Sequence, residues 1–230
     1  MKLVSNLYAY LWQGSDNNCN TYLFANILDK DRHVIIDPGH VTTPFYRESG
    51  LDRLAKEMER DGLKAEAIGL VILTHSHPDH CEAAKLIREK NGALVALHKA
   101  DEEMYKRLGG RIDLYLEEGE LELGKESQKI KLNIYHSPGH SPGHITIYWP
   151  EQKVLIAGDV IFYQSTGRVD LPGGSAQLLK QSINRLSELD IEYLLSGHPY
   201  GHPGIIKGKE AVQQNFDFVK KYVYPVLGAA

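Results

Sequence analysis

The sequence predicts a mixed α/β fold, and three observations lead to this prediction. Short apolar runs rich in Val, Ile and Tyr recur along the 230 residues and end at Gly, Pro, Asp or His. Segments with the helical spacing of apolar residues lie between several of these runs. Polar residues follow the runs directly, which is typical of a sheet that positions functional side chains. We therefore expect a single domain over residues 1–230, with helices outside the strands.

Eight runs are expected to form strands, because β-branched and aromatic residues dominate many of them and turn-forming residues bound them. They are Thr21–Ile27, His33–Ile36, Ile68–Leu73, Leu94–His98, Ile130–Tyr135, Ile145–Trp149, Val154–Ala157 and Ile191–Leu195.

Four segments carry a helical pattern. They are Leu51–Met58, Asp79–Lys90, the segment to Leu189 with Ser175 as its cap, and about Glu210–Tyr224. The polar interval Met104–Glu126, with its scattered Leu residues, fits a helix and a loop that borders the site.

Composition argues against several classes of protein. The net charge is −4 and no dense Lys/Arg run is present, so we expect no nucleic-acid partner. No apolar stretch approaches the roughly 20 residues of a membrane helix, and the first residues do not resemble a signal peptide. Cys19 and Cys81 are expected to be reduced thiols of a cytoplasmic protein. Although Cys81 follows His80, we interpret it as a small apolar residue at a helix start.

The segment 74–80, Thr-His-Ser-His-Pro-Asp-His, is the most informative part of the chain. It follows the apolar run Ile68–Leu73 and holds three imidazoles and one carboxylate. Imidazole is a good ligand for zinc, iron and similar metals, and carboxylate suits the harder ones. The segment therefore predicts a metal site at the end of a buried strand.

The spacing inside this segment predicts two directions for its side chains. If the strand continues in extended form, His75 and His77 point to one side. Pro78 disfavours helix at His77 and permits a helix to begin just after it. Asp79 and His80 are then expected to turn away from the first pair, so one segment can supply ligands to two neighbouring metals.

Further candidate ligands follow other strand-like runs. An isolated Asp or His after a strand is usually a turn former or a hydrogen-bonded surface group, but several in one chain point to a common site. They are Asp37 after Val34–Ile36, His140 after Ile130–Tyr135, Asp159 after Val154–Ala157 and His198 after Tyr193–Leu195.

With these residues the chain resembles the metallo-β-lactamase-fold hydrolases, through the ordered set Asp37, His75, His77, Asp79, His80, His140, Asp159 and His198. The resemblance implies a four-layer αβ/βα sandwich, with two mixed sheets flanked by helices and the metals at one edge. It implies that His75, His77 and His140 bind a first metal. It also implies that Asp79, His80 and His198 bind a second, that Asp159 bridges both, and that Asp37 orients ligands without binding metal.

The other six histidines are interpreted as surface or hydrogen-bonded groups. They are His33, His40, His98, His136, His144 and His202. Local pattern alone does not separate His140 from His144. The family pattern Pro-Gly-His-Ser/Thr-x-Gly favours His140, and His144 then begins the next strand.

The resemblance also implies a chemistry. Two divalent cations, zinc foremost with iron or manganese also compatible, would hold a bridging hydroxide that attacks an ester-like carbonyl, while Asp79 orients it. A thiolate leaves without prior protonation, so a small-molecule thioester or related ester is the expected substrate. The stretch from Gly158 and Asp159 to Gly167-Arg168-Val169-Asp170 resembles glyoxalase II-like thioesterases and persulfide dioxygenases.

Two other interpretations stay open. A persulfide dioxygenase of the same fold would bind a single iron at the positions of His75, His140 and Asp159. A non-catalytic or RNA-processing relative is less consistent with a complete ligand set and an acidic chain. Only 32 residues follow His198, so we do not expect the helical domain that confers S-lactoylglutathione specificity in full glyoxalase II. The oligomeric state is not predicted.

Overall fold

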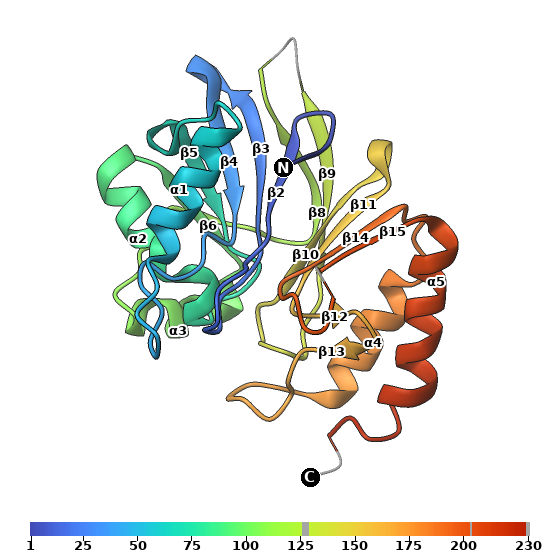
Figure 1. The fold of residues 1–230 in the computed structure, drawn as a ribbon. Coiled ribbons are helices and arrows are strands. Elements are labelled where there is room, and N and C mark those ends of the chain that lie inside the picture. The colour runs from blue at the N-terminus through green and yellow to red at the C-terminus, as the bar shows by residue number, and fades with distance from the viewer. Residues whose placement is uncertain (126–128, 203, 229–230) are drawn as a thin grey trace. The chain divides into compact units, whose positions relative to one another are not determined.

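The computed structural model describes residues 1–125, 129–202 and 204–228. The chain divides into two compact units. Unit 1 comprises Met1–Leu116 and Glu122–Ile130, and unit 2 comprises Glu117–Leu121 and Lys131–Ala230. Each unit is built on a mixed β-sheet with helices packed against it (Figure 1), which confirms the predicted α/β class. The expectation of a single domain over residues 1–230 stays a prediction.

Unit 1 has a seven-stranded sheet whose strands follow one another in chain order. They are β1 (Lys2–Val4), β2 (Leu7–Tyr10), β3 (Thr21–Leu28), β4 (Arg32–Ile36), β5 (Ile68–Ile72), β6 (Leu94–Leu97) and β7 (Leu114–Tyr115). The pairs from β1 to β4 are antiparallel, and those from β4 to β7 are parallel.

Three helices connect the parallel strands of unit 1: α1 (Gly50–Arg60), α2 (Pro78–Asn91) and α3 (Glu102–Arg107). They lie on one face of the sheet, where Met58 and Ile87 pack in a core with Leu23, Ile35 and Val71. Because β4, β5 and β6 are parallel, their carboxyl ends meet at one edge of the sheet, where ligands commonly bind in α/β proteins.

Unit 2 is built on a six-stranded sheet. Its order is β15 (Ile205–Lys207), β14 (Tyr193–Ser196), β11 (Val154–Gly158), β10 (Ile145–Trp149), β9 (Ile130–His136) and β8 (Gly119–Leu123). Helices α4 (Ala176–Leu186) and α5 (Lys209–Phe218) pack against it, with Ile183 and Phe216 in a core shared with Leu155 and Leu194.

Short elements complete the description. They are the hairpin β12 (Ile161–Phe162) and β13 (Ser165–Thr166), 3₁₀ turns at Asp29–Asp31, Ala65–Ala67, Lys99–Asp101 and Pro150–Gln152, and a π-helical turn at Val219–Val223.

All eight predicted strands and the four predicted helices are present, with ends that differ by a few residues. Ser175 caps α4 as predicted, because its hydroxyl accepts a hydrogen bond from the Leu178 amide. The interval Met104–Glu126 was expected to be a helix and a loop, but it contains the end of α3 followed by β7 and β8. These strands are short and largely exposed, so sheet pairing rather than residue pattern determines them.

Among the residues that the structure describes, we find no helix long and apolar enough to cross a membrane.

Candidate metal-binding residues

The unit 1 candidates follow two adjacent parallel strands. Asp37 comes directly after β4, and the segment 74–80 begins two residues after the end of β5. Ile36 pairs with Ile72, so the segments that follow β4 and β5 begin side by side at the same edge of the sheet. His77 is extended (φ −69°, ψ 144°) and α2 begins at Pro78, as the sequence predicts.

The three imidazoles of this segment form one cluster. The ring centroids of His75 and His77 lie 4.7 Å apart, which agrees with two side chains on one side of an extended segment. The expectation that His80 turns away from the first pair is wrong, because its ring centroid lies 4.1 Å from that of His75. The first turn of α2 brings His80 back toward the strand end. One ligand atom each from Asp37, His75 and His80 lies within 4.8 Å of the others.

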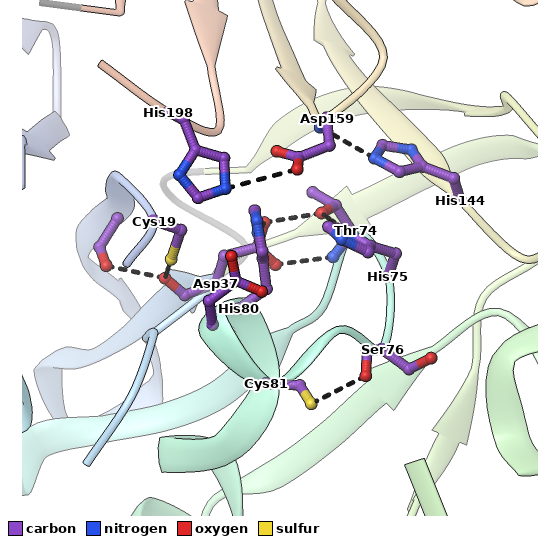
Figure 2. Close-up of polar contacts among 12 residues, drawn as sticks. Cys19, Asp37, Thr74, His75, Ser76, His80, Cys81, His144, Asp159 and His198 are labelled. Atoms are coloured by element: carbon purple, nitrogen blue, oxygen red, sulfur yellow. Dashed lines mark hydrogen bonds and ion pairs between the residues drawn. The ribbon is translucent and has the colours of Figure 1, made fainter. Parts of the chain in front are cut away.

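Hydrogen bonds occupy both oxygens of the buried Asp37 carboxylate (Figure 2). Oδ1 accepts from the Thr74 amide at 2.8 Å. Oδ2 accepts from Thr74 Oγ1 at 2.6 Å and lies 2.9 Å from His80 Nδ1. Asp37 is therefore arranged to orient its neighbours.

These contacts also assign the tautomers of two histidines. An ionised carboxylate only accepts, so His80 Nδ1 carries a hydrogen. The single hydroxyl hydrogen of Thr74 points to Asp37, so His75 Nδ1, 3.0 Å from Thr74 Oγ1, must donate to that oxygen. In both rings the lone pair is then on Nε2, the atom that a metal binds.

Asp37 itself is held in a strained backbone conformation, with φ of +52°. Its carbonyl oxygen accepts from Thr21 Oγ1 at 2.7 Å and from Cys19 Sγ at 3.3 Å. Its amide donates to the Ile72 carbonyl of the neighbouring strand end at 3.1 Å. Three contacts from two other segments thus stabilise the turn that aims the carboxylate.

Two residues that support this segment were not identified from sequence. The buried Asp101, after β6, accepts from the amide and the hydroxyl of Ser76 at 3.0 and 3.1 Å, and so holds the peptide between His75 and His77. Asn17 Nδ2 donates to Asp79 Oδ2 at 2.6 Å. Asp101 ends the 3₁₀ turn before α3 and Asn17 lies in a loop, both distant in sequence from residues 74–80, so no local pattern identifies them.

Cys81 behaves as predicted, as a small buried residue in the first turn of α2. Its Sγ donates to the Ser76 carbonyl at 3.3 Å, and burial raises the pKa of the thiol. Cys81 therefore contributes to packing as an un-ionised thiol, and it forms no disulfide.

The unit 2 candidates His140, Asp159 and His198 are all buried and follow β9, β11 and β14. Asp159 Oδ2 lies 3.4 Å from His140 Nε2 and 3.4 Å from His198 Nε2. Figure 2 shows His198 and Asp159 facing one another. A single carboxylate oxygen thus lies within 3.4 Å of two imidazole nitrogens.

His140 is held by the segment with the sequence Gly-Arg-Val-Asp. Its Nδ1 lies 2.8 Å from the Arg168 carbonyl, so Nδ1 donates and the lone pair is on Nε2. A Cβ at Gly167 would lie 2.0 Å from the Asp159 carbonyl oxygen and 2.9 Å from His140 Nδ1, so only glycine fits here. The Arg168 guanidinium pairs with Asp170 and lowers the pKa of that carboxyl to about 2.

The remaining histidines make the hydrogen bonds expected of non-ligand groups. His33 accepts from Asn26, His98 from Ala100, His202 from Gly204 and His144 from Asp159, while His40 pairs with Glu82 and His136 with Pro142.

The donor sets of the two units fit a divalent cation. They consist of buried imidazoles with Nε2 lone pairs and of carboxylates, which together suit zinc, iron and manganese. The Nδ1–H groups of three rings donate to a carboxylate, a hydroxyl and a carbonyl oxygen, which fixes the orientation of the rings as in known metal sites.

Comparison with known proteins gives a consistent family assignment. Residues 14–198 match the metallo-beta-lactamase superfamily. The chain is 34% identical to "Probable metallo-hydrolase MJ0888" of Methanocaldococcus jannaschii over 199 residues, covering 80% of this chain and 89% of that protein. It is 31% identical to "Hydroxyacylglutathione hydrolase GloC" of Haemophilus influenzae over 186 residues, covering 74% and 81%.

Two solved structures resemble the fold. The B3 metallo-beta-lactamase BLEG-1 superposes with a TM-score of 0.68 at 29% identity, covering 90% of this chain and 95% of that chain. TTHA1623 in a di-iron-bound form superposes with a TM-score of 0.64 at 29% identity, covering 83% and 91%.

Proposed function

The chain belongs to the metallo-β-lactamase superfamily, and within it we propose that the protein is a metal-dependent hydrolase that cleaves a thioester or related ester. The metallo-hydrolase class follows from the family. The substrate class is our proposal, and it depends on the arrangement of the ligand residues and on the chemistry of the leaving group.

We assign His75, His77 and His140 to a first metal, and Asp79, His80 and His198 to a second, with Asp159 as the bridging ligand. When bound, such cations lower the pKa of water from about 15.7 toward about 7 and stabilise a developing oxyanion. We propose zinc as the foremost occupant, with iron or manganese also compatible, and the di-iron form of TTHA1623 supports the iron alternative.

The observation that carries this proposal lies within unit 2. Asp159 Oδ2 is equally distant from the Nε2 atoms of His140 and His198, at 3.4 Å each. His140 Nδ1 donates to the Arg168 carbonyl, so its Nε2 carries a lone pair that faces Asp159 Oδ2, and a cation between these two atoms would stabilise the contact. The arrangement therefore supports a carboxylate that bridges two metals.

The chain's own residues would position the reactants. Asp37 holds the lone pairs of His75 and His80 on Nε2 through the hydrogen bonds to Thr74 Oγ1 and His80 Nδ1. We assign Asp79 to orient the attacking water by accepting its hydrogen. Asn17 fixes the plane of the Asp79 carboxylate through the 2.6 Å bond to Oδ2.

The leaving group favours a thioester. A thiol has a pKa near about 8.5, so a thiolate departs near neutral pH without a proton donor, whereas an amine does not. The similarity to hydroxyacylglutathione hydrolase GloC agrees with this substrate class. We propose a small-molecule substrate, no nucleic-acid partner, and a cytoplasmic location, to which the two buried free cysteines Cys19 and Cys81 are suited.

A panel assay tests the function. Purified protein is analysed for bound metals and then incubated with acyl thioesters, oxygen esters, lactones, a β-lactam and RNA, while thiol release is followed with a chromogenic disulfide. We expect metal-dependent thiol release that exceeds cleavage of the β-lactam and of RNA. His77→Ala serves as the ligand-deficient control.

Oxygen uptake separates hydrolysis from the dioxygenase alternative. Two metals per chain without oxygen uptake support the hydrolase. One iron per chain, with oxygen consumed on glutathione persulfide and no thioester cleavage, would overturn the proposal in favour of a dioxygenase.

A further inference from the structure

The amide of Asp159 leaves the hydrogen-bond ladder of its sheet. β11 pairs with β14 in parallel, and the register shifts between Ile156 and Gly158. Gly158 then takes a left-handed conformation with φ of +50°, which turns the chain at the strand end. Asp159 is only 6% exposed, so its N–H must find an acceptor within the protein.

His144 provides that acceptor (Figure 2). Its Nε2 lies 3.0 Å from the Asp159 nitrogen, and the His144 side chain is fully buried. Because Nε2 accepts, the ring is the neutral tautomer with its hydrogen on Nδ1. A residue 15 positions earlier in the chain thus satisfies the amide of the central carboxylate.

The position of His144 is itself fixed by the sheet. Its carbonyl oxygen accepts from the Ser137 amide at 2.7 Å, and Ile145, the next residue, begins β10 and pairs with His136 of β9. At the following peptide, Gly167 packs so closely that a Cβ would lie 2.0 Å from the Asp159 carbonyl oxygen. The two peptides that flank the Asp159 Cα are therefore both held in place.

We propose that His144 is a positioning residue that fixes the Asp159 backbone and so holds its carboxylate between His140 and His198. This inference rests on the proposed metal-binding role of those three residues. It requires no role for His144 as a ligand, since its Nε2 accepts a hydrogen bond from the backbone. Loss of the acceptor would leave a buried amide unsatisfied, and the strand end would shift to satisfy it.

Two substitutions of matched chemistry and different reach test the proposal. The amide oxygen of Gln lies about as far from Cβ as Nε2 of histidine, whereas that of Asn corresponds to Nδ1 and cannot reach Asp159. His144→Gln should therefore keep metal affinity within a few-fold of the original protein. His144→Asn should weaken it about 10–100-fold, the usual effect of removing a group that supports a metal ligand.

Zinc affinity is measured by competition with a chelator, together with the melting temperature of the metal-free protein. His136→Ala, whose imidazole contacts the Pro142 carbonyl, is the matched control and should bind zinc normally. Weakened binding in His144→Asn alone, with equal metal-free stability of the Asn and Gln variants, supports the proposal. Normal zinc affinity in His144→Asn overturns it, as does a loss in all variants that merely follows their melting temperatures.

The same measurements separate this inference from the proposed function. Wild-type protein that binds two zinc ions, shows the Gln and Asn contrast and cleaves no thioester would refute the substrate class and leave the role of His144 intact. Wild-type protein that binds no metal under these conditions would refute both.

Discussion

Replacing Asp37 by Asn should reverse a chain of hydrogen bonds and switch two histidine tautomers. The carboxylate accepts from three donors: the Thr74 amide, the Thr74 hydroxyl and His80 Nδ1. In Asp37→Asn, the NH₂ group cannot face the Thr74 amide, because two donors would meet there. It must therefore replace Oδ2 and face Thr74 Oγ1 and His80 Nδ1.

Both neighbours must then accept. His80 can accept at Nδ1 only if its hydrogen moves to Nε2. The Thr74 hydroxyl, now an acceptor, donates instead to His75 Nδ1, 3.0 Å away, which moves the hydrogen of that ring to Nε2 as well. In the tautomers that Asp37→Asn favours, Nε2 of His75 and Nε2 of His80 each carry a hydrogen. Neither atom then offers a lone pair to a metal.

The expected loss is about 10–100-fold in metal affinity, which is about 1.4–2.7 kcal/mol. The fold should survive, since shape and most hydrogen bonds are retained, whereas Asp37→Ala would orphan three donors and cost roughly 3–5 kcal/mol of stability. Chelator competition measures the affinity, and ¹⁵N shifts of the imidazole nitrogens report the tautomers of the metal-free protein.

Asp52→Asn on the exposed side of α1 is the matched control and should leave both readouts unchanged. Wild-type metal affinity in Asp37→Asn, with His75 and His80 still protonated on Nδ1, would refute the reasoning.

Three further predictions follow. His77→Ala should abolish turnover in a protein that stays folded by circular dichroism, and activity retained in metal-free buffer would contradict the mechanism. Gly167→Ala should lower the melting temperature by about 2–12 °C, because overpacking against the Asp159 carbonyl costs about 1–3 kcal/mol; an unchanged melting curve would show that the segment moves freely. The hydrogen bonds from Arg88 lower the pKa of Asp113, so the stability they give is present above the ordinary pKa near about 4 and is lost as pH falls through the lower folded value. Asp113→Asn should therefore be less stable than wild type at pH 7 and approach it in acid unfolding titrations; a constant difference would exclude this linkage.

The strands that precede the candidate ligands could be predicted from the sequence alone. The runs before Asp37, His75, His140, Asp159 and His198 all form strands, because their β-branched and apolar residues suit buried sheet positions. Pro78 also predicted the start of α2 correctly, since proline restricts the residue before it and suits a first helical turn. Each of these signals depends on a few neighbouring residues, so it can be recognised from the sequence alone.

The sequence failed where short elements depend on their partners. β7 and β8 were missed in the interval Met104–Glu126, because short, largely exposed strands show little burial pattern and form only when a neighbouring strand offers hydrogen bonds. The direction of His80 was predicted incorrectly for a related reason. Alternation along a strand says nothing about where the first turn of a helix places a side chain.

By itself the sequence determined which residues can bind metal, since ligand chemistry belongs to the residue type and the spacing is local. Only the tertiary structure determines the tautomers and the orientations with which those residues could bind a metal. The lone pairs on Nε2 depend on Asp37, Thr74 and the Arg168 carbonyl, and the Asp159 peptide depends on His144. A tautomer is set by whichever group lies at the other ring nitrogen, and distant segments supply most of those groups.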